Sequence, residues 1–144
     1  MDYRRFTKNS NAFTLVEVLV VVVIVGVLTA LAIPTYAKYI ETSRARSAWK
    51  VLKNIRNGER TFRLESGNFL AITEAAAPTA DTEWNKIQMD NPNKAQSAIG
   101  YRFWVDVASG TFSGRARRMT NNGIYTINEA GQIQGEANLP TVGY

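Results

Sequence analysis

An uninterrupted apolar run near the amino terminus constrains this chain more than any other feature. Residues 13–33 read FTLVEVLVVVVIVGVLTALAI and contain one charged side chain, Glu17. At about 1.5 Å of rise per residue, a helix of this length crosses the roughly 30 Å hydrocarbon core of a bilayer. Arg4, Arg5 and Lys8 precede the run. Because basic flanks stay cytoplasmic, the sequence predicts a single-pass membrane protein whose remaining residues lie outside the cytoplasm.

Glu17 is out of place in an ordinary membrane anchor, because it lies five residues into the apolar run. An acidic side chain at the centre of a membrane helix costs about 2.5–3.5 kcal/mol on insertion scales, and less near the interface. A residue retained at such a cost indicates a function. We therefore expect a positively charged group to pair with Glu17.

The residues around Glu17 form a motif. The string NAFTLVE at residues 11–17 resembles the processing signal of type IV prepilins and type II secretion pseudopilins, in which a short basic leader is removed before a Phe. The resemblance implies cleavage between Ala12 and Phe13, N-methylation of Phe13, and a role for Glu17 in assembly and register. The family usually has Gly where this chain has Ala12. Pro34 falls where the family often has a helix-kinking proline.

The chemistry of the new amino terminus suits this role for Glu17. Cleavage frees an α-amine with a reference pKa of about 7.7–8.0, which is largely cationic at neutral pH. In an apolar filament core, the Phe13 amine of one subunit would pair with Glu17 of another, because the alternative is an unpaired buried charge. We expect such a pair to set axial register, as a buried polar residue does in a coiled coil.

Two other interpretations of the apolar run remain open. The chain can be a signal-anchored extracytoplasmic ligand-binding module that does not polymerise. Alternatively, signal peptidase cleaves after Ala32, because Ala30-Leu31-Ala32 fits its small-x-small pattern. Neither interpretation explains Glu17, and the run is longer than the roughly 7–15 apolar residues of a signal peptide.

Composition argues against catalysis and cofactor binding. The 144 residues include no cysteine and no histidine, so the commonest general base and metal ligand are missing. Lys and Arg number 17 against 12 Asp and Glu, but they form no dense run interleaved with aromatics, and we expect no nucleic-acid partner. Glu129 and Glu136 are too few for a calcium site, which takes about six to eight oxygen ligands. We expect no enzyme, no cofactor and no metal.

Residues 35–66 continue the helix as an amphipathic half. Apolar residues recur there at spacings of three and four, with Glu59 inside the apolar stripe. The spacing of Glu59 and Arg63 predicts an ion pair along the helix. Gly67 is expected to end the helix in a left-handed cap.

The remaining residues predict a small head. Residues 67–99 are expected to be a variable connecting loop with one short helix near 81–88, and residues 100–144 an antiparallel β head with a C-terminal loop. Alternation predicts strands at 101–107, 111–117 and 124–128, with a short fourth strand near 132–134. The predicted fold class is α+β and pilin-like: a long amino-terminal α-helix packed on three or four antiparallel strands.

The resemblance implies a function and partners. Residues 1–12 would be the leader and residues 13–34 the transmembrane and assembly helix of a structural subunit, in a type IV pilus or a type II secretion pseudopilus. Implied partners are copies of itself or other pilins, a prepilin peptidase that also methylates, an inner-membrane platform protein and an assembly ATPase. Before assembly, the subunit would span the inner membrane with its head extracytoplasmic; after assembly, it would lie in a surface or periplasmic filament.

Overall fold

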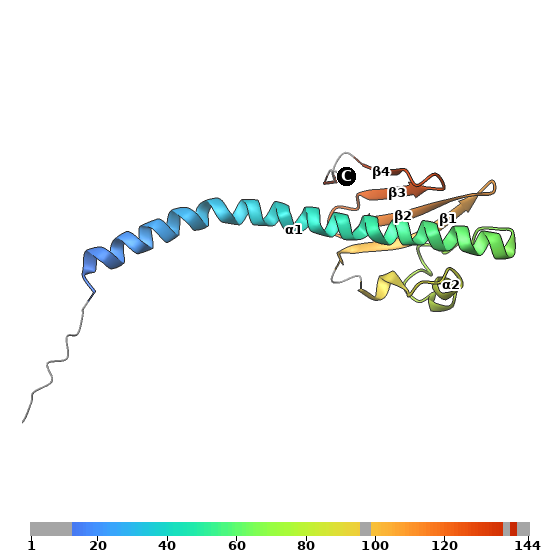
Figure 1. The fold of residues 1–144 in the computed structure, drawn as a ribbon, viewed down its shortest axis with the longest axis horizontal. Helices are drawn as coiled ribbons and strands as arrows, with labels where there is room; N and C mark the ends of the chain where they lie inside the picture. Colours follow the sequence, from blue (N-terminus) through green and yellow to red (C-terminus); the bar gives the residue numbers. More distant parts are fainter. Residues whose placement is uncertain (1–12, 96–98, 137–138, 141–144) are drawn as a thin grey trace, which may run out of the picture. The chain divides into compact units, whose positions relative to one another are not determined.

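The structure is a computed structural model that describes residues 13–95, 99–136 and 139–140. The chain divides into two compact units, Met1–Lys38 and Tyr39–Tyr144. One helix, α1, runs from Leu15 to Ser66 through Pro34 and contributes residues to both units (Figure 1). The predicted α+β class, with a long helix and a four-stranded antiparallel sheet, is confirmed.

In the first unit, α1 is a helix of exposed apolar side chains. Every residue from 13 to 38 is exposed to solvent. Two hydroxyl groups in this segment are satisfied within the helix: Thr29 Oγ1 donates to the Val25 carbonyl at 2.7 Å, and Thr35 Oγ1 to the Leu31 carbonyl at 3.2 Å. Satisfied hydroxyls are what an apolar environment demands of a helix.

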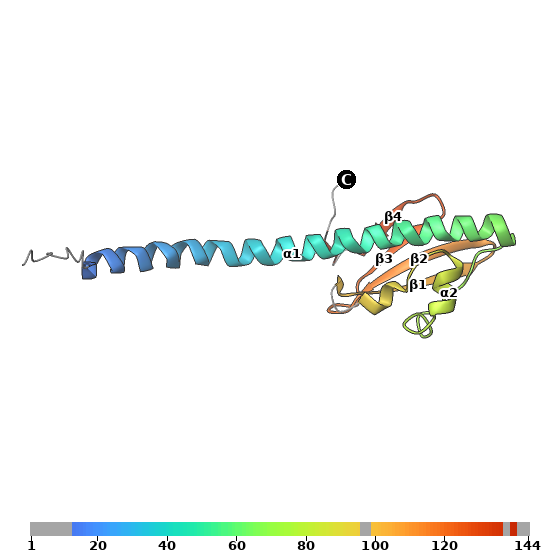
Figure 2. The same cartoon turned by 60° about the horizontal axis from the view of Figure 1, so that its bottom comes forward.

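In the second unit, α1 crosses one face of the sheet (Figure 2). The strands are β1 (Tyr101–Ala108), β2 (Thr111–Arg118), β3 (Ile124–Asn128) and β4 (Ile133–Gly135), each antiparallel to the next. The predicted stripe of α1 lies in the core, where Ala45, Ala48, Leu52 and Ile55 are fully buried. A Cβ on Gly114 would lie 2.9 Å from Ile127 Cγ2 and 3.3 Å from Ile55 Cγ2. The missing side chain of Gly114 therefore lets α1 pack closely on the sheet.

The predicted end of the long helix is confirmed. Gly67 has φ +81°, and its N–H donates to the Arg63 carbonyl at 2.8 Å, as expected for a left-handed cap. Phe69 then turns back onto the sheet and packs against Phe112, with ring centroids 4.9 Å apart. Ile72 pairs with Val105 of β1 through two backbone hydrogen bonds of 2.9 Å.

The connecting segment is more ordered than a loop. It contains α2 (Asp81–Lys86), where a short helix was predicted, and a 3₁₀ turn at Pro92–Ala95. Trp84 and Ile87 are buried, and a Cβ on Gly58 would lie only 2.2 Å from the Ile87 carbonyl oxygen. The segment therefore rests directly on the backbone of α1 at Gly58.

Asn93 joins this segment to the sheet. Its amide donates to the Ala77 and Phe103 carbonyls at 3.1 and 3.0 Å, and its Oδ1 accepts from the Phe103 N–H at 2.8 Å. The side chain thus substitutes for a neighbouring strand beside β1. Sequence analysis missed this residue, because a single Asn in a polar loop carries no pattern.

Candidate assembly site

The site predicted from sequence begins at the first turn of α1. Thr14 is the residue before the helix, and its Oγ1 accepts a hydrogen bond from the Glu17 N–H at 3.2 Å. This is the N-cap contact, which satisfies one of the free donors at a helix start. Sequence analysis missed this role of Thr14, although the spacing of Thr14 and Glu17 matches the T-x-x-E signature of a capping box.

Glu17 lies in that first turn and is exposed. The partial positive charge of a helix amino terminus favours a carboxylate there, by typically about 0.3–1 kcal/mol. The local structure thus tolerates Glu17 without supplying a full counter-charge. The predicted partner, the Phe13 amine of a neighbouring subunit, would arise only after cleavage.

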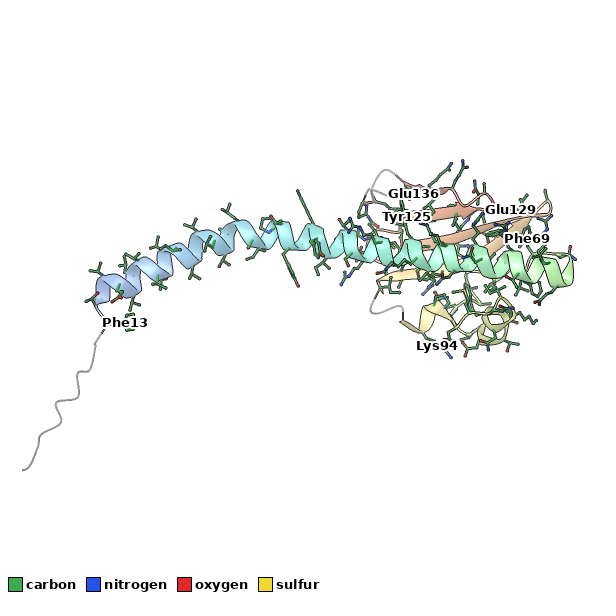
Figure 3. The ribbon with its side chains drawn as sticks, in the orientation of Figure 1. Phe13, Phe69, Lys94, Tyr125, Glu129 and Glu136 are labelled. Carbon is green, nitrogen blue, oxygen red and sulfur yellow. The ribbon has the colours of Figure 1, made fainter. Side chains whose placement is uncertain are left out.

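The predicted site residues are placed as follows. Phe13 precedes the helix with its side chain 77% exposed (Figure 3). Ala12, on the other side of the predicted cleavage bond, lies outside the described residues. Pro34 lies inside α1 and has no N–H to donate to the carbonyl one turn earlier. The kink at Pro34, the cleavage and the methylation stay predictions.

The apolar surface next to Glu17 is continuous. Its large side chains are roughly half to four-fifths exposed, from Leu15 at 80% to Val20 at 47%. By length and composition, α1 is able to cross a membrane. A soluble monomer does not leave such a surface in water. Lipid or other apolar helices must therefore cover it.

The head contains a second unusual acid, Glu59, which is fully buried. Glu59 Oε2 accepts a hydrogen bond from the Leu70 N–H at 2.9 Å, while Oε1 is buried and has no hydrogen-bond partner in the part of the chain that the structure describes. Burial raises the pKa of Glu59 to about 7, and the Leu70 hydrogen bond opposes part of that rise.

The predicted ion pair between Glu59 and Arg63 is wrong. Glu59 points into the head, whereas Arg63 pairs with Glu129 at 2.6 Å and lies over the Phe69 ring, 4.7 Å from its centroid. Figure 3 labels Phe69 and Glu129 near the carboxyl end of α1. Helical spacing allows a pair between Glu59 and Arg63, but packing of the head buries the acid and offers Arg63 another partner.

The aromatic residues of the head are mostly core residues. Tyr101, Phe103 and Tyr125 are at most 2% exposed. Trp104 lies on the other face of the sheet beneath Arg117, whose guanidinium is 5.3 Å from its ring centroid. The Tyr125 hydroxyl donates to the Pro140 carbonyl at 2.6 Å and so ties the C-terminal loop to β3. These contacts account for the aromatic residues without a ligand.

Comparison with known proteins agrees with this geometry. Residues 7–33 match the model of the prokaryotic N-terminal methylation motif. The chain is 33% identical to the type IV major pilin protein PilA of Myxococcus xanthus over 48% of this chain and 31% of that protein. It is 30% identical to a fimbrial protein of Moraxella nonliquefaciens over 62% of this chain and 61% of that protein. It is 27% identical to the type IV major fimbrial protein FimA of Dichelobacter nodosus over 78% of this chain and 81% of that protein.

The matches span less than two thirds of the length of the first two relatives. No solved structure matches the chain significantly. The fold and the exposed apolar segment define an α+β protein with a helix suited to a membrane. The methylation motif and these relatives support a relationship of this chain to the type IV pilin family. They confirm the resemblance predicted from sequence.

Proposed function

We propose that this chain is a structural subunit of a type IV pilin-like filament and not an enzyme. The observation that carries the proposal is the exposed apolar segment of α1, which begins with a capped turn containing Glu17. Such a segment is suited first to a bilayer and then to a bundle of identical helices. Moving between the two environments keeps the apolar side chains away from water.

Processing prepares the subunit for that transfer. A prepilin peptidase removes residues 1–12 and methylates Phe13, so that no basic leader has to enter an apolar core. The new amine and Glu17 of different subunits then neutralise one another. A contact between two different patches of the subunit does not close on itself, and it therefore extends into a helical fibre.

The proposed partners follow from this route. Before assembly, the subunit spans the inner membrane once with its head extracytoplasmic. A platform protein and an assembly ATPase drive its extraction into the growing fibre. The names of the relatives, which are pilins and fimbrial proteins, favour a surface pilus over a secretion pseudopilus.

Mass spectrometry of the subunit from its own cells tests the processing step. The expected mature protein begins at an N-methylated Phe13. A protein that keeps Met1 or begins at Ile33 would contradict the proposal and favour the signal-anchored or secreted alternatives.

Electron microscopy of sheared fibres tests assembly. Glu17→Ala is expected to insert into the membrane normally and to form few or no fibres, whereas Glu17→Asp retains the charge and part of the yield. Normal fibres from Glu17→Ala would refute the register role of Glu17. Failure of the unaltered subunit to enter any fibre would refute the proposed function.

A further inference from the structure

The half of α1 in the head carries a row of basic side chains on its exposed side. Arg46, Lys50, Lys53 and Arg60 follow one another at spacings of four, three and seven residues, and all four are exposed. At about 100° per residue, they fall within an arc of about 80°, and they extend over about 21 Å of helix. Asn57 lies in the same arc, between Lys53 and Arg60. We call these four residues the basic row.

The described residues supply no ion-pair partner for the basic row. Of the acids on this half of α1, Glu41 pairs with Arg118 and Arg44, and Glu59 is buried. The third, Glu65, is exposed but lies about 140° around the helix from Arg60. Among the residues that the structure describes, none of the four has an ion pair. Like charges three or four residues apart destabilise a helix by up to about 0.5 kcal/mol a pair. A partner that neutralises the row would remove this repulsion.

Acids without an ion pair lie elsewhere on the same chain. The connecting segment, residues 67–95, carries four acids and two lysines. Glu74 and Asp81 pair with Arg117 and Lys94, but Glu83 and Asp90 have no ion pair in the described parts of the chain.

The acids and the basic row cannot neutralise each other within one subunit. Ile87 holds the connecting segment against Gly58 of α1, and Gly58 lies about 120° around the helix from Arg46. Glu83 and Asp90 flank Ile87 in the sequence. The two sets of charges therefore stand on different sides of the head.

We infer that the basic row of one subunit binds the connecting segment of a second copy of this chain, with Glu83 and Asp90 as its counter-charges. This inference rests on the proposed filament. Because the two surfaces differ, the contact is heterologous and propagates along a fibre instead of closing a dimer. Burial of the apolar segments supplies most of the stability, and the charges select how neighbouring heads meet.

Charge reversal in the full-length chain, expressed in its own cells, tests the contact. Lys50→Glu with Lys53→Glu, and separately Glu83→Lys with Asp90→Lys, should each lower fibre yield about tenfold, because like charges then face one another. Combining all four substitutions restores opposite charges and should recover the yield to within about threefold. Glu65→Lys with Glu136→Lys is the matched control for Glu83→Lys with Asp90→Lys: both residues are exposed and lie outside the two proposed surfaces, the net charge changes equally, and yield should not fall.

Cysteine pairs give a second measurement that reverses no charge. The chain has no native cysteine, so Lys50→Cys or Lys53→Cys can be combined with Glu83→Cys or Asp90→Cys. At least one of the four pairings should give a ladder of disulfide-linked subunits in oxidised fibres, since the two α-carbons of a disulfide lie within about 7 Å. Single cysteine variants should give at most dimers.

The outcomes separate this contact from the proposed function. Wild-type yields from both charge-reversed variants, or a combined variant that is not rescued together with no ladder from any cysteine pairing, would overturn the contact. In either case, fibres of the unaltered subunit with mature Phe13 would leave the proposed filament standing. An unaltered subunit that forms no fibres would instead remove the function on which the contact rests.

Discussion

Inside the head, the carboxylate of Glu59 accepts a hydrogen bond of 2.9 Å from the backbone N–H of Leu70. The two residues lie on either side of the chain reversal at Gly67, where α1 ends. One buried side chain therefore joins the last turns of the helix to the first residues of the connecting segment. Removing a charged carboxylate from water costs free energy, and a buried hydrogen bond stabilises the fold only if it offsets that cost.

Because of this burial, Glu59 favours the folded head more in acid than at neutral pH. The pKa of Glu59 is raised to about 7 in the folded chain, whereas its unfolded value is about 4.5. Between these values, the folded state holds a proton that the unfolded state has lost, so this contribution to the free energy of unfolding falls as pH rises from about 4.5 to 7. The full loss is about 3 kcal/mol, at 1.36 kcal/mol per pKa unit.

Urea unfolding in detergent, followed by tryptophan fluorescence from pH 4.5 to 8, measures this dependence. Glu59→Gln cannot ionise and keeps an oxygen that accepts from the Leu70 N–H. The free energy of unfolding of this variant should therefore lack the fall of about 3 kcal/mol that the unaltered chain shows as pH rises. Glu65→Gln, at an exposed position on the same helix, is the control and should behave like the unaltered chain. Identical pH profiles for Glu59→Gln and the unaltered chain would contradict the prediction.

Gly58→Ala should weaken the contact between α1 and the connecting segment. The added methyl group would lie 2.2 Å from the Ile87 carbonyl oxygen, so the backbone of one element must move, at a cost of about 1–3 kcal/mol. Gly26→Ala is the matched control, because its added methyl group would meet nothing within 4 Å and alanine favours helix. Thermal unfolding of both variants in micelles should show a lower midpoint for Gly58→Ala only.

Asn93→Ala should detach the connecting segment from β1. The substitution removes three hydrogen bonds and leaves the Phe103 N–H and C=O without these partners, at about 1–3 kcal/mol for each buried group left unsatisfied. Hydrogen exchange at the Phe103 amide should accelerate. Asn85→Ala, at an exposed position of α2, should leave that amide protected; equal exchange in both variants would contradict the role of Asn93.

Thr14→Ala should fray the first turn of α1 in the processed subunit. The loss of the Thr14 Oγ1 contact leaves the Glu17 N–H unsatisfied, and loss of such a cap costs about 1 kcal/mol. Amide exchange at Glu17 in micelles should therefore quicken several-fold in Thr14→Ala. Thr14→Ser retains the hydroxyl and should exchange at nearly the original rate, whereas equally fast exchange in both variants would show that the cap does not protect this turn.

Local patterns predicted most elements of the fold because they report which residues face water. The four predicted strands occur close to their expected bounds: β1 and β2 each extend one residue further, and β4 is shifted by one residue at both ends. In β3, the buried Tyr125 and Ile127 alternate with half-buried neighbours. Between β2 and β3, the chain turns at Asn121-Asn122-Gly123, where Asn122 has a positive φ of 57°.

The sequence was sufficient for the apolar anchor, the stripe of α1, the positions of the strands and the motif around Phe13, because each depends on residues that are neighbours in the chain. Only the tertiary structure showed that Glu59 accepts a hydrogen bond from Leu70, that Arg63 forms an ion pair with Glu129, and that Asn93 hydrogen-bonds to β1. Arg63 and Glu129 are 66 residues apart, and no local spacing relates them. A polar side chain takes the partner that burial brings within reach, and burial is decided only when the helix and the sheet pack together.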